Sequence, residues 1–200
     1  MDRLSFSKAS LAKEAAQLKR YQHYLPSLDL KRKQLTAQRA KALAHLKQTE
    51  LNLHQSYQRV GELLPMLADE HIDLAGLVKI GNVEIGEENV IGVHVPALKV
   101  LEIRVIPYSF MSKPHWVDQV VLHLSHILRL KVQREVAIRR LDILELAVKK
   151  ITQRVNLFDK VLIPKTRENI RKIRIFLSDA EKAAVVNAKL TKNKRLNTGL

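Results

Sequence analysis

Residues 11–67 read LAKEAAQLKRYQHYLPSLDLKRKQLTAQRAKALAHLKQTELNLHQSYQRVGELLPML, and this stretch decides the fold. Counted as heptads from Leu11, its a and d positions are apolar at 12 of 17 places, without a slip in register. The a positions are Leu11, Leu18, Leu25, Arg32, Arg39, Leu46, Leu53, Val60 and Leu67; the d positions are Glu14, Tyr21, Leu28, Leu35, Ala42, Thr49, Ser56 and Leu63. Such spacing makes a narrow apolar stripe, here called the seam, on one face of a helix.

A second seam lies in the C-terminal half of the chain, at Leu141, Leu144, Val148, Ile151, Val155, Phe158 and Leu162. Beside Pro164 it resumes in a shifted register, at Ile163, Thr166, Ile170, Ile173, Leu177, Ala180 and Ala184. A proline beside a register shift indicates a local unwinding or bend. One seam near each end predicts a mainly α fold, a long antiparallel two-helix coiled coil with a small β-hairpin region in the middle of the chain.

The middle of the chain changes character. Four of the six glycines lie there, at Gly76, Gly81, Gly86 and Gly92, and β-branched residues alternate between them. This pattern predicts one or two short hairpins, with a turn at Gly86–Asn89. The predicted organisation is an N-terminal coiled-coil helix over 1–75, a hairpin-containing segment over 76–115, and a C-terminal coiled-coil helix with a basic tail over 116–200.

The two helices are interrupted or frayed at definite places. Pro26 is expected to kink the first helix or to split off the turns before it. The second helix should run from about Trp116 to about Lys189, with residues 193–200 frayed. If Ala75 lies near Trp116, Leu53 faces Ile138 and Arg32 lies across from Asp159, a charged pair that would fix the register.

The formal charge of +15 limits the kind of partner. Residues 30–49 carry six bases and no acid, and a second basic stretch follows Lys160. Such a surface suits nucleic acid, an acidic membrane or an acidic protein, and it is also typical of a solvated coiled-coil face. No aromatic residues that could stack bases are interleaved with the basic runs.

The chain has no cysteine, and residues 1–11 lack the apolar core of a signal peptide. Because no run approaches the ~18 apolar residues of a membrane span, we expect no membrane insertion.

The sequence predicts no catalytic, cofactor-binding or metal site. It contains no phosphate-binding glycine motif, and its serines have no base at a recognisable spacing. His115, His123 and His126 could approach one another, but Asp118 is the only carboxylate near them. Ordinary surface histidines are therefore the favoured interpretation.

Two groups of residues resemble those of a known family, the D subunit of V-type ATPases. Near the C-terminus these are Arg154, Val155 and Asn156, followed by Ile163 and Pro164; in the first helix they are Leu28, Lys31, Arg32 and Leu35. These nine residues are the candidates for family-motif or partner contacts. Lys33 stands where the family carries an aspartate, and Leu157 and Phe158 replace its usual Ala-Leu.

The resemblance implies a non-catalytic central rotor shaft that transmits torque between ATP hydrolysis or synthesis and proton or sodium translocation. Its implied partners are the catalytic A/B-type hexamer, the F subunit and an adaptor subunit on the membrane ring, without direct nucleic-acid contact or a cofactor. The implied location is cytoplasmic, peripheral to a membrane. A generic coiled-coil scaffold and a basic nucleic-acid-binding rod are the alternatives.

Overall fold

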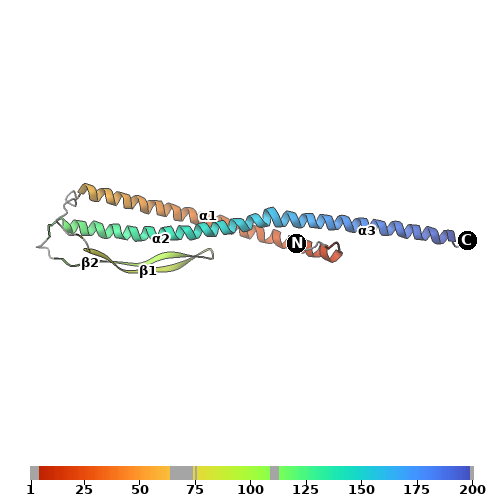
Figure 1. Cartoon of the computed structure of the whole chain (residues 1–200), viewed down its shortest axis with the longest axis horizontal. Helices are drawn as coiled ribbons and strands as arrows, with labels where there is room; N and C mark the ends of the chain where they lie inside the picture. The colour runs from red at the N-terminus through yellow and green to blue at the C-terminus, as the bar shows by residue number, and fades with distance from the viewer. Residues whose placement is uncertain (1–4, 64–73, 75, 109–112, 199–200) are drawn as a thin grey trace. The chain divides into compact units, whose positions relative to one another are not determined.

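The computed structural model describes residues 5–63, 74, 76–108 and 113–198. Its elements, in chain order, are α1 (Lys8–Leu63), β1 (Val78–Val90), β2 (Val93–Val105), α2 (Val117–Asn156), the π-helix η2 (Leu157–Leu162) and α3 (Ile163–Thr198) (Figure 1). The predicted fold class is confirmed, since two long antiparallel helical arms flank one β-hairpin. Two compact units divide the chain: unit 1 combines 1–31 with 151–200, and unit 2 is 32–150.

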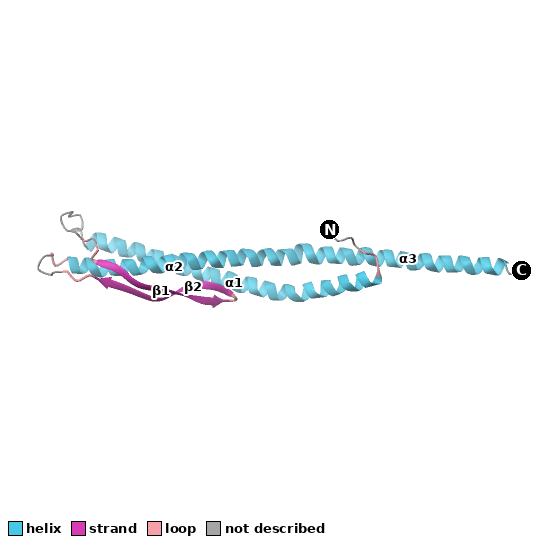
Figure 2. Cartoon of the chain, turned by 60° about the horizontal axis from the view of Figure 1, so that its bottom comes forward, coloured by secondary structure: helices cyan, strands magenta, loops and turns pink. Residues whose placement is uncertain are grey.

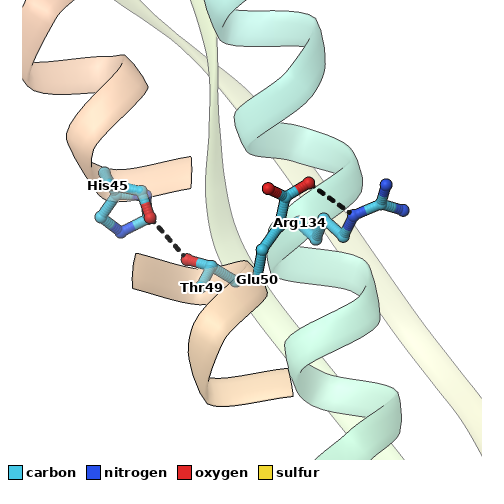
Figure 3. A network of polar contacts seen from close by, with 4 residues as sticks. All are labelled: His45, Thr49, Glu50 and Arg134. Carbon is cyan, nitrogen blue, oxygen red and sulfur yellow. Dashed lines mark hydrogen bonds and ion pairs between the residues drawn. The ribbon is translucent and has the colours of Figure 1, made fainter. Parts of the chain in front are cut away.

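The N-terminal seam is confirmed along α1. Every a and d position from Leu11 to Val60 is buried or half-buried; the side chains of Leu63 and Leu67 lie outside the described ones. Thr49 is a buried polar side chain at a d position, and its hydroxyl donates a hydrogen bond of 2.9 Å to the carbonyl of His45, one turn earlier (Figure 3). This local bond satisfies the hydroxyl without a partner across the seam. Pro26 lies inside α1, which continues through it, so of the two predicted outcomes the split is wrong and the kink stays a prediction.

Ion pairs across the seam define the register in unit 2. Arg39 Nη2 lies 2.8 Å from Glu145 Oε1, and Arg134 Nε lies 3.2 Å from Glu50 Oε1, a contact shown in Figure 3. Both pairs are 11 residues apart on each helix, so the register is constant between them. The expected register placed Leu141 opposite Glu50. Arg134 is there instead, seven residues earlier.

The register predicted from the position of Ala75 is therefore wrong, by one heptad in unit 2. In unit 1 the Phe158 ring packs edge-on against Tyr21, at 5.4 Å between ring centroids, twelve residues before Lys33, which the expected register placed there. The predicted pairing of Arg32 with Asp159 was built on that register and stays a prediction. A slip of one whole heptad returns a to a and d to d, so the apolar pattern cannot detect it.

The middle segment is a single hairpin whose turn differs from the prediction. Val90 pairs with Val93, and Gly86 and Asn89 lie inside β1. The two turn residues, Ile91 and Gly92, have φ of 55° and 74°, and the Asn89 side-chain oxygen accepts a 2.8 Å hydrogen bond from the Gly92 N–H. Two positive φ angles are typical of the type I′ turn, which matches the twist of paired strands better than the turn predicted at 86–89.

The hairpin is held by an apolar cluster inside unit 2. Buried Leu77 and Val78, where the hairpin begins, pack with Trp116 and Val117 at the start of α2. Val120 and Val121 complete the cluster, and the two strands lie alongside α2 in both views (Figures 1 and 2). Two-stranded ribbons are marginal in isolation, so this packing accounts for the stability of strands 13 residues long.

Unit 1 contains the register shift of the second seam. Ile151 and Val155 are buried before η2, and Ile163, Thr166, Ile170 and Ile173 are buried after it, whereas η2 itself contains no buried residue. The wider turn of a π-helix takes up one extra residue, so the seam leaves η2 one residue later and still faces α1. The Ile163 N–H bonds to the Phe158 carbonyl, a bond across five residues.

Pro164 explains why the extra residue is taken up at this place. A proline has no N–H and its ring crowds the carbonyl four residues earlier, here that of Lys160. Widening the preceding turn relieves this crowding. The predicted shift is thus confirmed, as a π-helix without a break, and α3 continues to Thr198, so the predicted end of the second helix near Lys189 is wrong.

Candidate partner-contact surfaces

The nine predicted contact residues fall into three classes of exposure. Leu35, Val155 and Ile163 are buried in the seam. Leu28, Lys31 and Arg32 are half-buried, and Arg154, Asn156 and Pro164 are exposed. The buried three hold the helices together, so within the chain only the other six can reach a partner. Their role in partner contact stays a prediction.

The exposed members of the C-terminal motif share a surface with the π-helix. Arg154 and Asn156 precede η2 and Pro164 follows it, and within η2 the apolar side chains of Leu157 and Val161 are 47% and 50% exposed. A π-helix is frequently found at a functional site. The exposed residues of this surface, residues 154–164, therefore combine polar and apolar groups that the seam does not use.

A second candidate surface is the outer segment of α3, residues 178–196, which is exposed at every position. Four large apolar side chains lie on it, at Val185, Val186, Leu190 and Leu196, each more than half exposed. Five bases accompany them, at Lys182, Lys189, Lys192, Lys194 and Arg195. An apolar and basic helix with so much exposed surface is typical of an element covered by a partner.

A third candidate surface lies on the hairpin and the residue that follows it. Ile80, Ile85, Val100, Val105 and Ile106 are each 37–48% exposed, although β-branched residues on strands are usually covered on one face. Glu88 of β1 forms an ion pair of 2.7 Å with Arg140 of α2. This contact, together with the apolar cluster, holds the hairpin to the helix while the five apolar residues stay accessible.

The electrostatics of the described residues are those of an exposed surface. The Lys172 ammonium donates a hydrogen bond to the Glu168 carboxylate and lowers the pKa of Glu168. The Tyr108 hydroxyl donates to Asp118, which raises the pKa of Tyr108. Among the described residues no three histidine, aspartate or glutamate side chains gather as metal ligands. Within the same residues, no helix is long and apolar enough to cross a bilayer.

The outer segment of α3 and the π-helix were not predicted from the sequence as possible contact surfaces. The signal for η2 was present, since Leu162 and Ile163 are adjacent and both have seam spacing. The signal for the outer segment was the loss of the seam after Leu177, where Ala180 and Ala184 are exposed.

Comparisons with known proteins agree over most of the chain. The model of a family described as the D subunit of ATP synthase matches residues 10–193. The V-type ATP synthase D subunit of Chlamydia felis is 35% identical over 196 residues, covering 96% of this chain and 93% of the relative. The protein of the same name from Borreliella burgdorferi is 29% identical over 193 residues, covering 96% and 95%, and that of Chlamydia trachomatis serovar L2 is 31% identical over 196 residues, covering 96% and 95%.

Proposed function

Because this chain belongs to the family of ATP synthase D subunits and is the central stalk subunit of a V-type rotary ATPase, we propose that it is a non-catalytic shaft that transmits torque. Torque passes between ATP hydrolysis or synthesis and the translocation of protons or sodium ions. The observation that carries the proposal is the family match over residues 10–193, on a chain built of two long antiparallel helical arms.

The contacts between the helices suit a part that must turn without slipping. In unit 2 the pairs Arg39–Glu145 and Glu50–Arg134 join the two helices at one constant register. In unit 1, Tyr21 of α1 packs against Phe158, and Phe6, which precedes α1, packs against Phe176 of α3 at 5.0 Å between ring centroids. Each exposed ion pair contributes little free energy, so the apolar seam supplies most of the resistance to sliding.

The outer segment of α3 is the proposed contact with the catalytic hexamer. Its 19 residues span about 28 Å at 1.5 Å per residue, a depth suited to insertion into a ring of subunits. The exposed apolar residues supply area, and the bases supply attraction to acidic loops that is individually weak. Weak single contacts allow the shaft to pass from one subunit to the next.

The remaining surfaces are assigned to the other partners of the shaft. The F subunit is proposed to dock on the surface around η2, where Leu157 and Val161 are exposed. The adaptor on the membrane ring is proposed to contact unit 2 near the cluster of Leu77 and Trp116. The chain would then be cytoplasmic and peripheral to the membrane.

Co-purification tests the proposal. The full chain carrying a tag is expected to retain the catalytic hexamer and the F subunit, and a stable preparation lacking both would refute the proposal. In a Val186→Asp/Leu190→Asp variant, hexamer affinity should fall about ten-fold or more, because two exposed apolar anchors become charged. The control, Asn187→Asp/Thr191→Asp, makes the same charge change at the same spacing on another side of the helix. It should lose less affinity for the hexamer.

A nucleic-acid-binding rod makes an opposite prediction in the same preparation. Its affinity for DNA or RNA would fall by roughly three or more log units over a few-fold rise in salt if about six phosphates were contacted. An affinity for DNA or RNA that is weak and changes little with salt concentration would exclude that alternative.

A further inference from the structure

A groove of about 630 Å³ lies between α1 and α3 inside unit 1. Its apolar part is formed by two seam residues, half-buried Leu18 and buried Ile170, together with exposed Ala15 and Ile175.

Four cations line this groove. Lys19 comes from α1, and Arg167, Arg171 and Arg174 come from α3. The three arginines are four and three residues apart, so they lie along one side of the helix over about 10 Å. No carboxylate is among the lining residues.

The charge of the groove is not compensated within the described chain. Neighbouring bases of unit 1 have carboxylate partners: Lys8 pairs with Glu181, Lys172 with Glu168, and Lys182 with Asp179. Among the described residues, the four groove cations form no ion pair with a carboxylate. Like charges held side by side on one helix face repel, and an anion that bridges them removes this repulsion.

We propose that the groove binds a short phosphate chain, the di- or triphosphate group found in inorganic polyphosphates and in nucleotides. Guanidinium groups bind phosphate oxygens through paired, charge-assisted hydrogen bonds, and three of them in line match a linear anion with several charges. Binding of this kind by the free chain does not depend on the stalk function.

The lining of the groove favours a phosphate chain over a nucleic-acid strand. Proteins that bind single strands combine a basic track with aromatic side chains on which bases stack. None of the residues that line the groove is aromatic. The chemistry present recognises the phosphates and offers nothing for a base.

Calorimetric titration of the full chain with sodium tripolyphosphate, ATP and adenosine at low salt tests the proposal. Tripolyphosphate and ATP should bind with similar affinity, and adenosine should not bind. An Arg171→Gln/Arg174→Gln variant should lose about ten-fold or more in affinity for both anions, because two charged hydrogen-bond donors are removed.

The matched control is Arg139→Gln/Lys172→Gln, which removes the same charge from two bases that pair with Glu135 and Glu168. It should bind nearly as tightly as the parent chain, and all variants should keep the parent's helical circular dichroism. Equal weakening by both double variants, binding of ATP without tripolyphosphate, or no binding of either anion would each overturn the proposal. An oligothymidylate bound far more tightly than tripolyphosphate would assign the groove to nucleic acid and also overturn it.

Discussion

In a Pro164→Ala chain, which is the parent for this comparison and lacks the ring that crowds the preceding turn, deleting Val161 should convert the C-terminal arm into one continuous α-helix. The buried residues on the two sides of η2 are one residue out of phase, and removing one residue restores the alternating spacing from Leu141 to Leu177. Val161 is 50% exposed, so its loss removes about 1 kcal/mol of apolar burial. Regained α-helical hydrogen bonds offset this loss by about the same amount. The free energy of unfolding should therefore stay within about 1 kcal/mol of the parent value.

The control is the deletion of Gln153, which is also exposed but lies where the seam is regular. That deletion rotates Val155 and Phe158 out of the seam and should cost about 3 to 5 kcal/mol. Thermal melting followed by circular dichroism distinguishes the two. A midpoint within about 4 °C of the parent is expected for the Val161 deletion, and a fall of about 10 °C for the control. Equal loss in both variants would refute the idea that η2 absorbs a single extra residue.

Two further predictions concern the hairpin and one surface ion pair. Ile91→Asn should stabilise the hairpin by about 1 kcal/mol, since asparagine tolerates the positive φ that strains isoleucine. Slower amide hydrogen exchange in β1 and β2 would measure this gain in stability, and Ile91→Val is the control. Unchanged exchange in Ile91→Asn would contradict the prediction. Glu168 should titrate below the ordinary pKa of a glutamate, because Lys172 stabilises its charged form. The resulting stability is present above the unfolded-state pKa and is lost as the pH falls through the lowered folded-state value. Carbon NMR follows the titration, Lys172→Gln should return the pKa towards its ordinary value, and no change in that variant would exclude the pair as the cause.

The fold class and the seam could be predicted from the sequence because apolar spacing is a local property. From Leu11 to Val60, each predicted seam position is buried or half-buried. The register could not be predicted, because a slip of one heptad leaves every seam residue in place. Arg134 opposite Glu50 is a pairing that only the structure reveals.

The turn and the contact surfaces were harder to predict from the sequence, because they too depend on how distant segments pair. Gly86–Asn89 contains typical turn residues, but the pairing of thirteen-residue strands moved the turn to Ile91 and Gly92, at the expense of a β-branched residue with positive φ. Of the nine motif residues, Leu35, Val155 and Ile163 are buried in the seam. A motif in a sequence does not separate residues that build a helix pair from residues that meet a partner.

The exposed outer segment of α3 affects how stable the chain is before it joins its complex. A lone helix of 19 residues is only marginally stable in water, because few contacts offset the entropy of ordering it. Copies that have not found their complex would open there first and would offer an unfolded, lysine-rich end to cellular proteases. The residues that are proposed here to contact the partners would thus also allow surplus copies to be degraded, and so match the amount of this protein to that of its complex.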